Sequence, residues 1–146
     1  LFAINGYPNV YGLDINGEAL KRAAKKGIRT IQGDISVVEM QENAFDIVFC
    51  SHVLEHTIWP ELALKNLRHC LKPDGVLLLE IPIETDAQFN VSQKEQGHVQ
   101  QFNPWVALNF RELFDVIWVH DCMDRESSEY CGRYVLKNKT FLLRKK

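Results

Sequence analysis

Two apolar stretches, AFDIVFCS at residues 44–51 and VLLLEI at residues 76–81, decide the fold class. Each is too continuous for a half-exposed strand and short for a helix, so we predict two strands buried on both faces. Between them, Pro60 begins an amphipathic segment with leucines at helical spacing, and KPDG at residues 72–75 is a strong turn signal. A strand, a helix and a second strand in this order form a right-handed parallel unit.

The same alternation extends towards the N-terminus. Residues 9–14 are β-branched and aromatic, and they end on a carboxylate. Residues 16–26 place their alanines and Leu20 on one helical face, with Asn16 as a cap and Gly27 as a stop. Residues 28–33 then predict a second short strand.

The C-terminal part is less regular. Residues 84–101 are polar and predict a surface loop, and residues 103–114 predict a helix. Residues 116–119 and 140–143 predict a terminal antiparallel strand pair, because no helical pattern lies between them. We therefore expect one domain over residues 1–146: a Rossmann-like three-layer α/β/α sandwich with a mostly parallel sheet.

Composition excludes several classes of protein. The 146 residues carry 17 basic and 19 acidic side chains, a net charge of −2, so we expect no nucleic-acid partner. No apolar run approaches the roughly 20 residues that span a bilayer, and we expect no membrane partner. Four cysteines without metal-ligand spacing argue against a disulfide scaffold or a cysteine metal site. Reduced thiols in a cytoplasmic protein are the expectation.

Polar residues at the ends of the predicted strands are the candidate binding residues, since ligands of open parallel sheets bind beyond the carboxyl ends of strands. Asp14 can accept two hydrogen bonds from a ribose diol, and Asp34 can accept from an amine such as that of adenine. Ile35 can pack on the base. The alternative is that each aspartate only caps a turn, but the presence of two favours the ligand role.

Several motifs together resemble the class I S-adenosylmethionine-dependent methyltransferases. They are VYGLDI (10–15), GDI (33–35), FDIVFCSHVLEH (45–56) and LRHCLKPDGVLLL (67–79), in the family's order. GHV at residues 97–99, followed by FNP at residues 102–104, is similar to a subgroup that methylates small molecules.

The resemblance implies a cofactor, S-adenosylmethionine, and a role for each matching residue. Asp14 would hold the ribose hydroxyls, with Ile15 lining the adenosine pocket. Asp34 would accept from the adenine amine, and the Ile35 N–H would face a ring nitrogen. Ser51 and His52 would border the methionine part. The implied activity is methyl transfer to an O, N or C nucleophile on a small acceptor, with no catalytic residue assigned because alignment supplies much of the rate.

The family's glycine-rich turn and first strand are missing from the sequence, which opens at Leu1 without an initiator Met. We expect the chain to begin partway through a domain, or else to borrow a strand from a partner as a homo-oligomer. The rival functions are a catalytically inactive scaffold and, less favoured, a nicotinamide-dependent dehydrogenase, whose ribose Asp14 would also suit.

Two histidine patterns stay open to interpretation. His98, in the polar loop, either orients or deprotonates an acceptor or is a loop histidine bonded to backbone. His52, Glu55 and His56 could form a metal site, since some methyltransferases of ubiquinone biosynthesis carry similar acidic and histidine residues in this segment. We nevertheless expect no metal site, because three residues within one turn surround a cation poorly.

Overall fold

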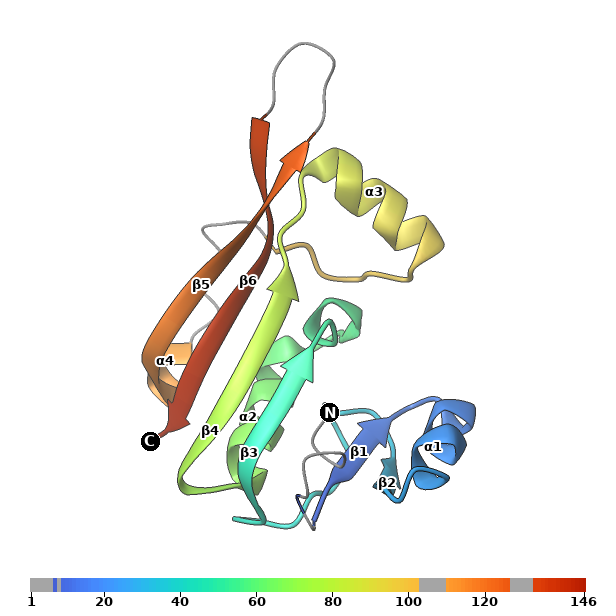
Figure 1. The fold of residues 1–146 in the computed structure, drawn as a ribbon, viewed down its shortest axis with the longest axis vertical. Coiled ribbons are helices and arrows are strands. Elements are labelled where there is room, and N and C mark those ends of the chain that lie inside the picture. Colours follow the sequence, from blue (N-terminus) through green and yellow to red (C-terminus); the bar gives the residue numbers. More distant parts are fainter. Residues whose placement is uncertain (1–6, 8, 103–109, 127–132) are drawn as a thin grey trace.

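The computed structural model describes residue 7 and residues 9–102, 110–126 and 133–146. The elements are, in chain order, β1 (Tyr11–Asp14), α1 (Gly17–Ala24), β2 (Arg29–Gln32), β3 (Phe45–Ser51), the short 3-10 helix η2 (Leu54–His56), α2 (Pro60–Cys70), β4 (Leu71–Pro82), α3 (Asp86–Glu95), α4 (Phe110–Leu113), β5 (Phe114–Glu126) and β6 (Arg133–Lys145) (Figure 1).

The strands form two sheets. β1 and β2 pair in parallel as a two-stranded sheet, with Asp14 opposite Gln32. The second sheet has the order β3-β4-β6-β5, in which β3 and β4 are parallel and β6 is antiparallel to both of its neighbours. The predicted parallel units and terminal antiparallel pair are therefore confirmed. The strands of that pair are 13 residues each, much longer than the predicted segments.

Helix capping follows the sequence closely at α1. The Asn16 side chain accepts hydrogen bonds from the backbone N–H groups of Glu18 and Ala19 at 3.0 and 3.2 Å. Gly27 follows the helix with a φ of 81°, a left-handed conformation that glycine adopts without a steric penalty.

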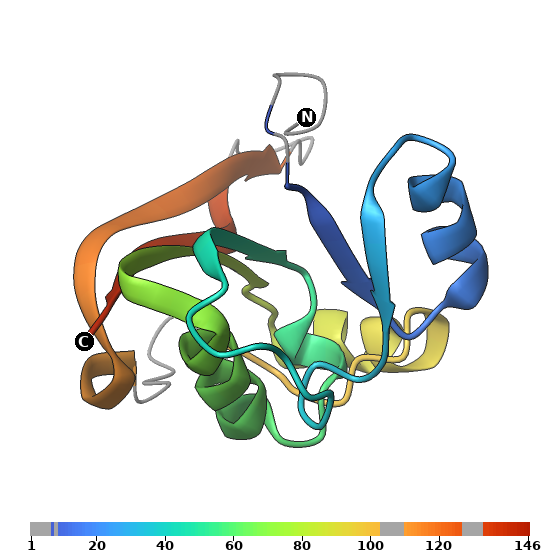
Figure 2. The ribbon, with the colours of Figure 1, turned by 90° about the horizontal axis from the view of Figure 1, so that it is seen from below.

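The core lies between α2 and the four-stranded sheet (Figure 2). It contains mainly leucines of α2 and β4, together with Leu54 and Phe114, all of them fully or almost fully buried. Every second residue of β4, from Leu77 to Ile81, faces this layer, which is the alternation of a strand with one buried face.

The prediction that β3 is buried on both faces is wrong. Cys50 faces the core, but Ile47 and Phe49 are 48% and 52% exposed. Both side chains line the cavity beside β1, together with Tyr7 and Tyr11. A continuous apolar run therefore indicated burial that the described residues do not provide.

Two further expectations differ from the structure. Residues 84–101 are not simply a loop, because Asp86–Glu95 form α3, which begins with a capping box between Thr85 and Gln88. The predicted turn residues 72–75 lie within the bounds of β4, which begins earlier than expected; they fall at an irregularity of the pairing, between the pairs Phe45–Leu71 and Ile47–Val76. Of the predicted helix over residues 103–114, the structure describes α4 over Phe110–Leu113, whereas Phe114 already begins β5 and residues 103–109 lie outside the described residues.

Candidate functional site

The predicted binding residues at Asp14 and Asp34 come to one edge of the two-stranded sheet. β1 ends at Asp14, and Asp34 lies two residues beyond the end of β2, which runs parallel beside it. In each aspartate one carboxylate oxygen, Oδ1, accepts from the backbone N–H two residues on: Asn16 at 2.9 Å and Ser36 at 2.7 Å. Within the described chain, Oδ2 of each accepts no hydrogen bond. Each side chain therefore caps a turn and keeps an oxygen for a ligand.

The two isoleucines that follow these aspartates differ in environment. Ile15 is 72% exposed beside Asp14 and is free to contact a ligand. The Ile35 side chain is buried in the core cluster, and its carbonyl accepts from Asn66 at 2.9 Å. The Ile35 side chain is thus part of the core, and the predicted contact of its backbone N–H with a ring nitrogen stays a prediction.

Ser51 and His52 lie at the carboxyl end of β3. The Ser51 hydroxyl donates to Glu80 Oε2 at 2.8 Å, and the His52 N–H donates to the Glu80 carbonyl at 3.1 Å. His52 has a φ of 52°, in the left-handed region, and its Nδ1 lies 3.2 Å from Glu55 Oε1. Glu80 on β4 thus fixes the segment that leaves β3.

His98 lies next to this segment in three dimensions, although it is far from it in sequence. The ring is buried, and its Nδ1 lies 3.0 Å from Glu84 Oε2. It also packs edge-on against the His56 ring, with centroids 4.8 Å apart. The ring of His98 therefore contacts a carboxylate rather than the backbone, and its predicted role beside an acceptor stays a prediction.

Glu55 is a residue that the sequence did not mark as part of the site on its own. Its side chain is completely buried between His52, His56 and His98. Burial raises the pKa of the Glu55 carboxyl, and a backbone hydrogen bond and the three histidines act against that rise. Neither carboxylate oxygen has a hydrogen bond of good geometry, although Oε1 is within ion-pair distance of His52.

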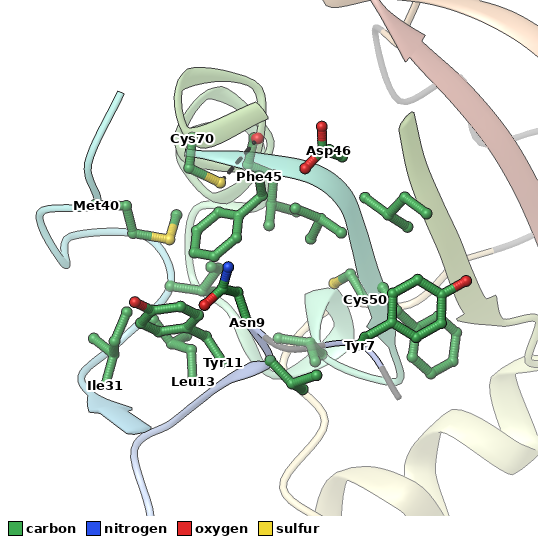
Figure 3. Close-up of a pocket in the computed structure, with 17 residues that line it drawn as sticks. Tyr7, Asn9, Tyr11, Leu13, Ile31, Met40, Phe45, Asp46, Cys50 and Cys70 are labelled. Atoms are coloured by element: carbon green, nitrogen blue, oxygen red, sulfur yellow. Dashed lines mark hydrogen bonds between the residues drawn. The ribbon is translucent and has the colours of Figure 1, made fainter. Parts of the chain in front are cut away.

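A separate cavity of about 370 Å³ lies between β1 and β3. Figure 3 shows Tyr11, Met40 and Phe45 at one end of it and Tyr7 and Cys50 at the other. Its lining is largely apolar, and of the predicted binding residues it includes Ile35. The cavity is a gap between the two sheets, distinct from the strand ends where Asp14 and Asp34 lie.

Known proteins resemble this chain in both sequence and fold. The sequence profile of a family described as "Methyltransferase domain" matches residues 1–79, more than half of the chain. The chain belongs to this methyltransferase family. The match confirms the predicted family, and the solved structures described below confirm the Rossmann-like fold. The predicted cofactor, S-adenosylmethionine, is confirmed as well.

Solved methyltransferases resemble this domain along nearly its whole length. An S-adenosylmethionine-dependent methyltransferase from Mesorhizobium loti superposes with a TM-score of 0.77 at 16% identity, covering 97% of this chain and 82% of that one. The N-methyltransferase NodS from Bradyrhizobium japonicum, in complex with S-adenosyl-L-homocysteine, gives 0.69 at 17% identity, covering 94% and 66%. At these identities the likeness shows the fold.

Curated relatives match shorter parts of the methyltransferase domain. A tRNA U34 carboxymethyltransferase from Hydrogenovibrio crunogenus is 33% identical over 78 residues, which are 53% of this chain and 23% of that protein. The mitochondrial arginine-hydroxylase NDUFAF5 of Mus musculus is 28% identical over 109 residues, 68% and 32% respectively. The chain thus spans a third or less of the length of these relatives.

The expectation of no nucleic-acid partner is wrong as an exclusion. Relatives of this methyltransferase domain are tRNA U34 carboxymethyltransferases, from two bacteria. Net charge failed as a criterion because it averages the whole chain and says nothing of a local surface or of segments elsewhere in a longer protein. In the described part of the chain, no helix is long and apolar enough to cross a membrane.

Proposed function

We propose that this domain binds S-adenosylmethionine at the carboxyl ends of β1, β2 and β3 and transfers its methyl group to an O, N or C nucleophile. The observation that carries the proposal is the pair of carboxylates at Asp14 and Asp34. They lie on adjacent parallel strands, and each keeps an oxygen that accepts no hydrogen bond within the described chain. Such a donor-free pair fits a nucleoside, which presents hydroxyl and amine donors.

Each candidate residue would contact a different part of the cofactor. Asp14 would accept from the ribose hydroxyls, and Asp34 would accept from the adenine amine. Ile15 would cover the adenosine, and the Ile35 N–H would face a ring nitrogen. Ser51 and His52 would border the methionine part. When bound, the cofactor supplies a methyl group on a sulfonium, and the protein contributes alignment of the acceptor with that group.

A small molecule is the acceptor that we propose first. The support is the likeness of residues 97–99 and 102–104 to a subgroup with small acceptors, and the place of His98 beside the end of β3. The relatives that act on tRNA make a nucleic acid the second candidate. A methyl-transfer assay with labelled cofactor should therefore include total tRNA beside a small-molecule panel.

Calorimetric titration with S-adenosylhomocysteine tests cofactor binding without knowledge of the acceptor. We expect Asp14→Ala to weaken binding by about 1.5–3 kcal/mol, the loss of hydrogen bonds to a charged acceptor. Asp14→Asn keeps an oxygen for the turn to Asn16 and should lose much of the affinity too, which separates ligand binding from capping. Asp46→Asn is the matched control, because this exposed aspartate lies at the other end of β3 and pairs with Lys72.

The titration also helps to distinguish an active methyltransferase from a catalytically inactive scaffold. Equal affinities of the wild type and both Asp14 variants would contradict the assignment of the ribose site. Wild-type binding without turnover of any acceptor would favour the inactive scaffold. We further propose that residues 1–146 act as one domain in a reducing, cytoplasmic compartment, which suits the free thiols at Cys50, Cys70 and Cys122.

A further inference from the structure

The buried carboxylate of Glu55 has few partners in the described part of the chain. The side chain has no exposed surface, and neither oxygen accepts a hydrogen bond there, although His52 Nδ1 lies within ion-pair distance of Oε1 at 3.2 Å. The backbone holds it in place, because the N–H groups of Val99 and Gln100 both donate to the Glu55 carbonyl, at 2.7 and 3.0 Å. A buried carboxylate of this kind is normally paired or bound to a metal ion.

Two histidines lie within reach of this carboxylate. His56 comes from the same 3-10 helix, and His98 comes from the segment that follows α3. One ligand atom from each of the three residues can be chosen so that all lie within 4.8 Å of one another. The two imidazole rings are nearly perpendicular, at 89°, so they do not stack over the position between them.

The outer contacts of both rings suit metal binding. His98 Nδ1 lies 3.0 Å from Glu84 Oε2, and His56 Nδ1 lies 3.3 Å from the Gly97 carbonyl oxygen. A carbonyl or a carboxylate oxygen accepts, so each Nδ1 carries a proton, and in the neutral form of each ring Nε2 is the nitrogen with the lone pair. A ring held in this way by a carboxylate or a backbone carbonyl is the usual arrangement of a metal-ligating histidine.

The charge balance also favours a cation. The Glu55 and Glu84 side chains are both nearly buried, and no described lysine or arginine pairs with either. The basic groups that face them are three histidines, His52, His56 and His98. A divalent ion would neutralise the two carboxylates, one directly and one through His98.

We propose that Glu55, His56 and His98 bind a divalent transition-metal ion, with Zn²⁺ as the best match. Two imidazoles and one carboxylate are a ligand set of zinc and related metals, whereas Mg²⁺ and Ca²⁺ prefer oxygen ligands alone. Ligand atoms on one Zn²⁺, at about 2.0–2.1 Å each, lie closer together than 4.8 Å. Rotation of the exposed His56 side chain would close that gap.

This site replaces the expectation that no metal would bind. Within η2 the residues do crowd one turn, but His98 supplies the ligand from another direction, which the sequence spacing did not indicate. Three protein ligands leave a fourth position on the ion, and His56 gives that position access to solvent. Water or an oxygen-bearing ligand could occupy it.

Metal binding to the chain, stripped of metal by a chelator, tests the proposal. Titration with Co²⁺ should develop visible absorption of an ion with nitrogen and oxygen ligands, and Zn²⁺ should displace it at one equivalent. We expect His98→Ala and Glu55→Gln each to weaken binding at least tenfold. His69→Ala removes an exposed histidine of α2 and should bind as the wild type does.

Glu84→Gln is a subtler variant, because it changes the contact behind His98 and leaves all three ligands. We expect it to weaken binding about 10–100-fold, as loss of such outer contacts does. Circular dichroism in chelator shows whether each variant is folded. The proposal is overturned if the folded wild type takes up no stoichiometric Co²⁺ or Zn²⁺, a result that needs no variant. It is overturned equally if His69→Ala loses as much affinity as His98→Ala.

Discussion

At Cys50 a thiol faces the core from β3 and reaches the cavity between the two sheets. Desolvation raises its pKa to about 12, and the nearby Glu55 adds to the rise. A thiol with a pKa of about 12 is almost wholly protonated at pH 8, and the thiolate is the nucleophilic form. Cys50 is therefore a small packing group rather than a nucleophile.

Thiol modification of the native chain at pH 8 should consequently spare Cys50. Cys122 is exposed and should react first with an alkylating reagent, as peptide mapping by mass spectrometry would show. In denaturant both cysteines should react, because unfolding removes the burial that raises the pKa. Equal rates at Cys50 and Cys122 in the native chain would contradict this environment.

The candidate site residues differ in how well their positions could be predicted from the sequence. Asp14 and Asp34 follow strand patterns directly, so local spacing was enough to place them on one edge. The Glu55 and His98 contact depends on the path of residues 84–98, which local patterns do not determine. A buried glutamate with histidines around it carries no periodic signal in a single sequence.

Among the elements, α1 shows most clearly how a cap connects to the site. Asn16 donates its N–H to Asp14 and accepts from two N–H groups of the helix. We expect Asn16→Ala to lower the free energy of unfolding by about 0.5–2 kcal/mol. Asn16→Asp keeps the accepting oxygen and should stay close to the wild type in urea denaturation.

The helix α3 was not predicted from the sequence, which indicated a surface loop instead. The segment carries few large apolar residues, so it lacks the periodicity that indicates a helix. Its start is marked instead by Thr85 and Gln88, spaced as a capping box, and both of the box's hydrogen bonds are present. That signature could have identified the helix. The length of β5 and β6, in contrast, could not be predicted, because only the short central part of each strand is apolar.

On the scale of the whole molecule, burial is uneven between the two sheets. Over residues 11–32, which hold β1, α1 and β2, Leu20 is the buried side chain, whereas β4 buries almost every second residue. Segments with little buried apolar surface open more readily than the core does. The unit that carries Asp14 should thus be the less stable part of the described fold.

Hydrogen exchange followed by mass spectrometry would measure this difference. We expect amides of β1 and β2 to exchange well before those of β4 and β6. Addition of S-adenosylhomocysteine should slow exchange in residues 11–34 more than in β6, since the ligand would contact the former. Equal exchange rates in the two sheets would contradict this difference in stability.

The left-handed backbone of His52 sets two contributions to stability against each other at a single position. Glycine adopts such a φ at no steric cost, so the backbone alone should gain roughly 0.5–1 kcal/mol of stability from His52→Gly. The same change would remove the imidazole that lies 3.2 Å from Glu55, and the loss of that neighbour from a buried carboxylate costs stability. His52→Ala, which loses the imidazole and keeps the left-handed backbone, should therefore be less stable than His52→Gly.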